Sequence, residues 1–401
     1  HEQIDQTSNG NYKSSLIGKW HLSGMRNRNA NYPNEVGIDH YAGLLGGGVP
    51  DYSNWNLTEN RVTSPSTEYA TTKITDLAID WINDQSQPWF CWVAYNAAHT
   101  PFHLPPANMH SQGNLPSDQG SIDANPLPYF LAMIESMDFE MGRLFSSIPA
   151  AQLENTTIIF VGDNGTPTQV LQAPFQPRQG KATLNQGGIW VPMVASGKGV
   201  QRANVREEAL INVSDLFSTI VELTGTEMPK IHNSFSFKSL LEIEGPAPRS
   251  CIYAEVSTAM RTGFAARDET YKLIEIQGQA DQFFNLIDDP YEYNDLLTGT
   301  LTTEAQASYD ILKNGCDDTV NSTDEPTRLV ESLAIYPNPS STEINIYSDE
   351  NESELSIIDL NGKVVRKEVL KHGQNQISIA DLDSGWYVMK MNRQFGRFEK
   401  I

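Results

Sequence analysis

The sequence is poor in cysteine and in basic residues, and it contains no long apolar run. Only 28 Lys and Arg stand against 50 Asp and Glu, which gives a formal net charge of −22. Because a nucleic-acid-binding protein neutralises phosphates with a basic face, this balance argues against a nucleic-acid partner. No stretch approaches the roughly 18 consecutive apolar residues of a membrane-spanning helix, so we expect no transmembrane segment.

The three cysteines are too few for a disulfide framework. Cys91 lies in the apolar run 89–93, where we expect it as a core thiol. Cys251 and Cys316 could pair, but their spacing alone leaves this open. The chain begins at His1 rather than at Met, and we expect the natural amino terminus to lie upstream.

Composition separates a long acidic part from a short basic end. Residues 361–401 hold eight Lys or Arg against four Asp or Glu, a net charge of +4, which leaves −26 for the rest of the chain. Residues 313–332 are polar and aperiodic, which is typical of a linker. After them, alternating apolar residues and the pair Asn361-Gly362, a hairpin signal, predict a small all-β sandwich.

Before residue 313, apolar runs alternate with helical patterns, which favours an α/β fold with a largely parallel sheet covered by helices. The predicted strands are residues 15–18, 89–95, 157–161 and 189–195, and the predicted helices are residues 129–145 and 213–223. Antiparallel strands at 252–255, 263–266 and 271–276 indicate a small α+β subdomain. We therefore expect an α/β domain at 1–245, this subdomain at 246–312, a linker at 313–332 and the all-β domain at 333–401.

Polar residues follow three of the predicted strands: first Lys19 and His21, then His99, and then Asp163 and Asn164. In open α/β sheets ligands bind outside the carboxyl ends of the strands, so we expect these groups to meet there. Lys19 and His21 are two residues apart, so in an extended segment both side chains point to one side. An ammonium beside an imidazole suits an anionic reaction centre, as a fixed charge and a proton carrier.

The other candidates have two interpretations each. His99, between an apolar strand and a proline-rich loop, is well placed as a general acid, but a single histidine there is more often a hydrogen-bonded loop residue. Asp163 and Asn164 offer hard oxygen ligands for Ca²⁺ or Mg²⁺, although Asn-Gly is also a common turn. Lys181, taken alone, would be an ordinary solvated lysine.

Together the motifs resemble the sulfatase family, in that family's order, over about residues 12–297. They are Gly18-Lys19-Trp20-His21-Leu22, His99-Thr100-Pro101, Asp163-Asn164-Gly165, the Lys181 loop with Gly187-Gly188-Ile189-Trp190-Val191-Pro192, and a closing motif at 281–296. The resemblance implies an alkaline-phosphatase-like α/β/α sandwich with a small C-terminal α+β subdomain. The sequence departs from the family in three places. The glycine that follows the first motif comes one place late, because Ser23 stands before Gly24, Gln186 replaces the usual Glu, and Trp190 replaces the usual Arg.

The resemblance also implies a reaction, the hydrolysis of a sulfuric ester through a formylglycine nucleophile. His99 would protonate the departing alcohol, and His21 would help to expel sulfate. Lys19 and Lys181 would bind the sulfate oxygens and stabilise the charge that develops on them, with His99 also touching the substrate.

A metal and a nucleophile complete the family's site. Asp163 and Asn164 would hold part of a Ca²⁺ or Mg²⁺ site, together with an Asp pair that the family places near its amino terminus. The sequence contains neither that pair nor a Cys/Ser-x-Pro-x-Arg motif, the source of the formylglycine, so whether the nucleophile derives from Cys or Ser stays open. We therefore expect the chain as given to show no appreciable turnover, weak Ca²⁺ affinity and an unpaired edge in its central sheet.

The end of the chain carries a second resemblance. Ile335-Tyr336-Pro337-Asn338-Pro339-Ser340, Leu360-Asn361-Gly362-Lys363 and Leu382-Asp383-Ser384-Gly385-Trp386-Tyr387 resemble the C-terminal sorting domain of the Bacteroidetes type IX secretion system. This resemblance implies that the protein engages the type IX machinery and is secreted or displayed at the cell surface. A generic carbohydrate-binding β-sandwich is the alternative.

We therefore expect a sulfuric ester hydrolase that acts on sulfated poly- or oligosaccharides. One alternative is a non-catalytic surface protein that binds sulfated glycans through Lys19, Lys181 and their neighbours. Another is a phosphodiesterase or phosphatase of the same superfamily, which would use Thr or Ser as its nucleophile.

Overall fold

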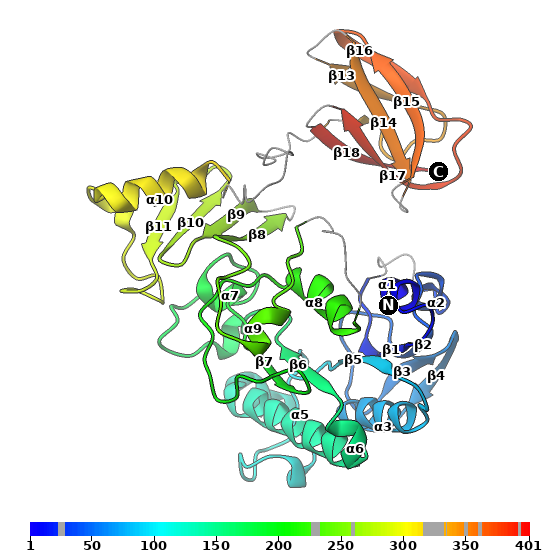
Figure 1. The fold of residues 1–401 in the computed structure, drawn as a ribbon, viewed down its shortest axis with the longest axis vertical. Coiled ribbons are helices and arrows are strands. Elements are labelled where there is room, and N and C mark those ends of the chain that lie inside the picture. The colour runs from blue at the N-terminus through cyan, green and yellow to red at the C-terminus, as the bar shows by residue number, and fades with distance from the viewer. Residues whose placement is uncertain are drawn as a thin grey trace. The chain divides into compact units, whose positions relative to one another are not determined.

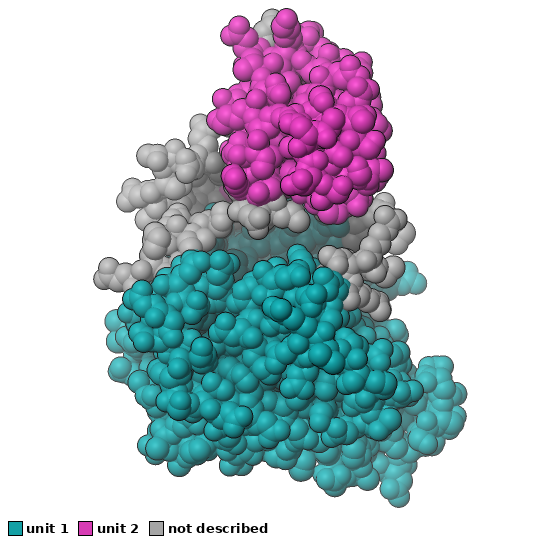
Figure 2. Space-filling model, turned by 90° about the vertical axis from the view of Figure 1, so that its right-hand side faces the viewer, with its two compact units in different colours: residues 1–312 teal, residues 313–401 magenta. Residues whose placement is uncertain are grey.

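The computed structural model describes residues 1–22, 29–225, 233–257, 261–315, 333, 335–348, 352–359, 363–391 and 394–401 (Figure 1). The chain divides into two compact units, residues 1–312 and 313–401, which Figure 2 shows in different colours. Cys316, most of the predicted linker and the predicted Asn361-Gly362 turn lie outside the described residues. Cys251 takes part in a disulfide bond, and Cys91 is free.

A five-stranded sheet with the order β4-β3-β2-β1-β5 organises the first part of the chain. Its strands are β1 (Lys13–Lys19), β2 (His40–Leu44), β3 (Trp55–Glu59), β4 (Val62–Ser66) and β5 (Trp89–Ala94). β1 is parallel to β2 and β5, but β3 is antiparallel to both β2 and β4, so the sheet is mixed rather than largely parallel. Only Asn60 and Arg61 join β3 to β4, both with positive φ, and so short a hairpin connection forces an antiparallel pair.

Two long helices cover this sheet. α3 (Ala70–Asn83) packs on β1, β5 and α5, and α5 (Leu127–Ser147) includes the whole of the predicted helix 129–145. On α3, Ile74, Ala78 and Ile82 recur every fourth residue and are buried with Ile17 of β1. Among the described residues no helix combines the length and the apolar character needed to cross a membrane.

A separate two-stranded sheet pairs β6 (Thr157–Val161) antiparallel with β7 (Met193–Gly197). The predicted strand 189–195 is wrong at its start, because residues 186–189 form the helical turn α7 (Gln186–Ile189). This turn brings Gly188 against Gly165, whose backbone N–H donates to the Gly188 carbonyl oxygen at 2.9 Å. In the described part of the chain β5 pairs with β1 alone, and its Trp92 side chain is 55% exposed.

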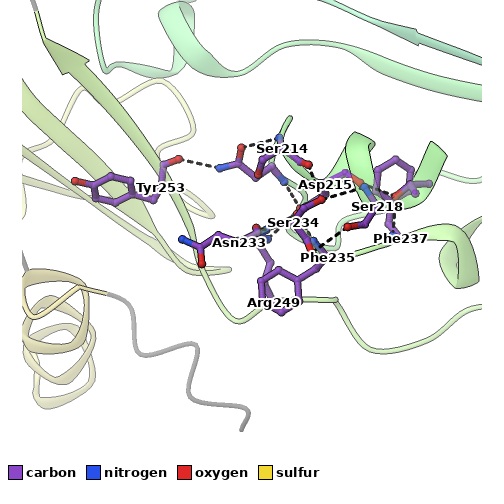
Figure 3. Close-up of polar contacts among 11 residues, drawn as sticks. Ser214, Asp215, Ser218, Asn233, Ser234, Phe235, Phe237, Arg249 and Tyr253 are labelled. Carbon is purple, nitrogen blue, oxygen red and sulfur yellow. Dashed lines mark hydrogen bonds and ion pairs between the residues drawn. The ribbon is translucent and has the colours of Figure 1, made fainter. Parts of the chain in front are cut away.

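A buried ion pair fixes α8 (Asp215–Leu223), which begins two residues after the predicted start and ends before Gly225 (Figure 3). The Arg249 Nε donates to the Asp215 carboxylate at 3.0 Å, and the Phe235 N–H donates to the same group at 2.9 Å. Asp215 is fully buried, so these donors replace the water that the carboxylate loses on folding. The contacts tie α8 to the chain on either side of α9 (Lys238–Glu242).

A small α+β subdomain follows, as predicted. Its antiparallel sheet has the order β11-β10-β9-β8 and consists of β8 (Ile252–Ser257), β9 (Thr262–Arg267), β10 (Tyr271–Ile276) and β11 (Gln282–Asn285). η3 (Leu296–Thr298) and α10 (Thr303–Lys313) follow the sheet. The short remaining helices are α1 (Glu2–Thr7), α2 (Tyr32–Glu35), η1 (Ala107–Met109), α4 (Gln119–Ala124), α6 (Ala150–Leu153) and η2 (Thr168–Val170).

The second unit consists of strands. One sheet has the order β12-β13-β16 and the other β15-β14-β17-β18. The strands are β12 (Ile335–Tyr336), β13 (Glu343–Ser348), β14 (Ser353–Asp359), β15 (Val364–Leu370), β16 (Gly373–Ser378), β17 (Gly385–Met391) and β18 (Gln394–Lys400). Alternate residues such as Ile344 and Ile346 of β13 and Leu355 and Ile357 of β14 are buried in one core that the two sheets share. This arrangement is the expected all-β sandwich.

Candidate active site

Lys19 and Asp163 come from distant parts of the sequence and form an ion pair. The Lys19 Nζ lies 3.3 Å from the Asp163 Oδ2. Lys19 is the last residue of β1, and Asp163 follows β6 by two residues, so the carboxyl ends of these strands lie side by side. The Asp163 side chain is 71% exposed, and such a pair contributes at most about 1 kcal/mol to stability. This ion pair therefore matters because it places Lys19 next to Asp163, rather than for its contribution to stability.

His21 and His99 lie against adjacent glycines of the loop that follows β2. A Cβ on Gly47 would stand 2.4–2.6 Å from three atoms of the His21 ring, and a Cβ on Gly48 would stand 3.2 Å from the His99 Nδ1. Neighbouring Cα atoms are about 3.8 Å apart, so the two rings contact neighbouring points of one backbone segment. His21 is also two residues from Lys19, which places all three groups at the end of β1.

The contacts of His99 determine which ring nitrogen remains for chemistry. Its Nδ1 lies 2.8 Å from the Thr100 carbonyl oxygen, which can only accept, so Nδ1 carries a proton and donates it. The Nε2 is then the nitrogen that can exchange a proton with a ligand. The hydroxyl of buried Tyr52 donates to the carbonyl oxygens of Asn96 and His99, at 2.9 and 2.8 Å, and holds this turn in place.

Lys181 is placed near Asp163 through the backbone. The Lys181 N–H donates to the Thr166 carbonyl oxygen at 2.8 Å, which closes the base of the loop 166–181. Thr166 lies three residues after Asp163, so this loop begins at the candidate site. Among the described residues the Lys181 side chain itself makes no hydrogen bond or ion pair with the other candidates.

Asp163 and Asn164 offer oxygen ligands of the type that Ca²⁺ and Mg²⁺ prefer. Two side chains are too few for either ion, however, and one oxygen of Asp163 already contacts Lys19. The described residues contain no group of three or more His, Cys, Asp or Glu placed to hold a metal. On their own these two residues do not form a divalent-cation site, and no chemical step through a metal follows from them.

A buried polar cluster supports the segment after Lys181, and the sequence did not predict it. The Lys272 Nζ on β10 donates to the Glu292 Oε1 at 2.5 Å and to the Gln186 Oε1 at 3.2 Å. Glu292 accepts a third bond from the Gln186 N–H at 2.9 Å. Burial lowers the pKa of Lys272 to about 8, although Glu292 opposes this shift. Gln186, which replaces the family's usual Glu, therefore lies beside the carboxylate of Glu292.

Gly47 and Gly48 were also missed. Their signal in the sequence is the run of three glycines at 46–48, which is typical of a backbone that another group approaches closely. Which side chains approach it depends on the fold, so the sequence alone does not assign the contacts to His21 and His99.

A family model described as Sulfatase matches residues 4–226, which is more than half of the 401 residues. The chain belongs to the sulfatase family. All six candidate residues, namely Lys19, His21, His99, Asp163, Asn164 and Lys181, lie within the matched region. Members of this family generally use a divalent metal and a formylglycine.

Two curated relatives of this sulfatase chain are similar at low identity. An uncharacterized sulfatase of Escherichia coli K12 is 27% identical over 252 residues, which cover 55% of this chain and 43% of the relative. The arylsulfatase G of Mus musculus is 25% identical over 271 residues, which cover 54% of this chain and 48% of the relative. The chain thus spans less than half the length of these two relatives.

Solved structures confirm the fold of the sulfatase part. A protein solved in complex with its substrate D-glucosamine-2-N,6-O-disulfate has a TM-score of 0.61 and 18% sequence identity, and the match covers 77% of this chain and 80% of that one. At this identity the likeness concerns the fold alone. It confirms the expected alkaline-phosphatase-like α/β architecture.

A second family model, the Secretion system C-terminal sorting domain, matches residues 334–400. This match confirms the predicted sorting domain and corresponds to the described strands of the second unit. The sorting domain indicates that the protein is exported.

Proposed function

We propose that this protein is a sulfuric ester hydrolase that acts on sulfated poly- or oligosaccharides. The observation that carries the proposal is the convergence of three distant segments at the end of β1. Lys19 contacts Asp163, while His21 and His99 lie against adjacent glycines of one loop. A fixed cation beside two imidazoles suits an ester whose oxygens are negatively charged.

Each basic residue has a role in this proposal. Lys19 and Lys181 hold the sulfate oxygens and stabilise the charge that develops on them in the transition state. The Nε2 of His99 protonates the departing alcohol, because Nδ1 is occupied by the Thr100 carbonyl oxygen. His21 assists the release of sulfate.

Two further groups belong to the proposal. Asp163 and Asn164 would hold part of a Ca²⁺ or Mg²⁺ site that needs further ligands, and no step of the reaction is assigned to the cation. Members of the family generally use a formylglycine as the nucleophile, and the 401 residues contain no Cys/Ser-x-Pro-x-Arg motif from which it would form. We therefore propose that the chain as given binds its ligand without turning it over.

The substrate class and the route of export also form part of the proposal. A structural relative was solved with a disulfated glucosamine as its substrate, and a sorting domain ends this chain. We propose a sulfated carbohydrate substrate, export by a type IX machinery of the Bacteroidetes, and action outside the cell or at its surface. The proposed domains are 1–245 and 246–312 for the sulfatase, 313–332 for the linker and 333–401 for sorting.

Calorimetric titration of the chain with sulfated monosaccharides tests this proposal. Lys19→Ala and Lys181→Ala should each weaken binding about tenfold, because each removes one charge-assisted contact. Lys367→Ala, which removes a surface lysine paired with Glu354 in the second unit, serves as the matched control and should change nothing. Equal affinities for all four proteins would contradict the proposed site. Hydrolysis of an aryl sulfate by the chain as given would contradict the proposed absence of its nucleophile.

A further inference from the structure

An open hollow of about 440 Å³ is lined largely by the loop 166–181, which begins three residues after Asp163 and ends at Lys181. Its walls include Thr168, Phe175 and Arg178 of the loop 166–181, and Tyr293 from the segment after β11. The same loop is closed at its base by the bond between the Lys181 N–H and the Thr166 carbonyl oxygen. The hollow therefore lies on the loop that carries Lys181 at its end, and its volume is in the range of small-molecule sites.

Hydrogen bonds fix the two walls of the hollow to each other. The Tyr293 hydroxyl donates to the Pro174 carbonyl oxygen, and the Gln176 Nε2 donates to the Glu292 carbonyl oxygen at 2.6 Å. The Glu292 side chain is in turn held by buried Lys272. A hollow with walls fixed in this way is formed before any ligand arrives, which lowers the entropy that binding must overcome.

The chemistry of the walls combines a cation with aromatic rings. Arg178 is exposed and forms no ion pair with any residue that the structure describes. Glu292, the residue before Tyr293, is buried, and its carboxylate is paired with Lys272. Tyr293 is 57% exposed, and Phe175 is the other aromatic residue of the walls.

This combination fits a sugar that carries a sulfate group. A guanidinium is a planar fork that binds the oxygens of a tetrahedral anion in pairs. An exposed aromatic ring offers a flat apolar surface with a polar rim, which suits the C–H face of a pyranose. An unpaired arginine offers a positive charge to an anionic ligand in a chain whose net charge is −22.

We infer that the hollow lined by Arg178 and Tyr293 is a second saccharide subsite, which takes a sulfated sugar linked to the one whose ester contacts Lys181. Arg178 binds the second sulfate, and Tyr293 supports the sugar ring. The inference rests on the proposed function, and it specifies the substrate as a saccharide with a second sulfate group on the neighbouring sugar.

Calorimetric titration of the full chain tests the subsite. The probes are galactose 6-sulfate and matched disaccharides from heparin, chondroitin sulfate and carrageenan that carry one or two sulfate groups. At least one disulfated disaccharide should bind about tenfold more tightly than its monosulfated counterpart. Arg178→Ala should remove this difference and leave the affinity for galactose 6-sulfate unchanged, and Tyr293→Ala should weaken binding of both disaccharides.

Two controls separate the possible results. Arg206→Ala removes an exposed arginine that pairs with Glu208, so it should leave every affinity as in the wild type. Lys181→Ala should weaken the binding of all sulfated probes, the monosaccharide included. Two results would overturn the subsite and leave the proposed function standing. One is an affinity for the disulfated disaccharides that depends on Lys181 but not on Arg178. The other is the lack of any preference for a second sulfate group. Affinities that do not change in Lys181→Ala would instead overturn the proposed function.

Discussion

The residues that decide the geometry of the candidate site include glycines as well as charged groups. His21 and His99 approach the backbone at Gly47 and Gly48 so closely that a side chain at Gly47 has no room. The φ of His21 is 51°, in the left-handed region that residues other than glycine seldom adopt. A small change in this loop therefore acts directly on the imidazoles.

Gly47→Ala should displace the His21 ring, because the new methyl group would lie 2.4–2.6 Å from three ring atoms. Gly48→Ala should move His99 much less, since its closest approach would be 3.2 Å. NMR spectra of the imidazole groups would measure both shifts. Gly142→Ala on α5 meets no atom within 4 Å and serves as the control. A His21 resonance unchanged in Gly47→Ala would contradict the packing described here.

A half-buried histidine should make the protein sensitive to acid. The His103 ring stacks on Tyr52, with ring centroids 4.1 Å apart, and burial lowers the pKa of His103 below its ordinary 6.5. Below pH 6.5 the unfolded chain therefore binds more protons at this residue than the folded chain, so stability falls as the pH falls.

Urea unfolding between pH 7.5 and pH 5 would measure this contribution. His103→Gln keeps a polar group beside Tyr69 and removes the titration, so its free energy of unfolding should fall less steeply with acid. Parallel curves for the variant and the wild type would show that His103 does not contribute.

At the scale of elements, the sequence predicted the parts whose pattern is local. The helix 129–145 was found because its apolar residues repeat at helical spacing, and the strand 271–276 was found from its apolar run. β4 was missed because it exposes four of its five residues, so no apolar pattern marks it in the sequence. The contacts of Gly47 and the ion pair of Lys272 depend on segments distant in sequence, so no local pattern predicts them.

The buried cluster of Lys272, Glu292 and Gln186 joins β10 to α7, the turn that follows the Lys181 loop. Lys272→Met should lower the free energy of unfolding by about 3–5 kcal/mol, because it leaves the Glu292 carboxylate buried without its cation. The double variant Lys272→Met with Glu292→Leu should recover part of the loss, since both charges are then removed. Urea unfolding would measure both. A double variant less stable than the single one would contradict this account of the pair.

At the scale of the whole molecule, the described residues hold the basic groups of the proposed site but only two of its proposed metal ligands. A ligand stabilises the folded state in proportion to the logarithm of its concentration over its dissociation constant. Asp163 and Asn164 alone provide few oxygens, so we expect that removing Ca²⁺ with a chelator shifts the melting temperature of the chain by less than about 1 °C. A shift of many degrees would mean that the chain holds a complete metal site.

The most direct test of the central claim is a crystal structure of the chain with a sulfated saccharide. We predict that one sulfate group lies at the end of β1, within about 3.2 Å of the Nζ atoms of Lys19 and Lys181, with the ester oxygen next to the His99 Nε2. Sulfate bound elsewhere, or side chains of Lys19 and Lys181 that do not share one sulfate group, would contradict the account.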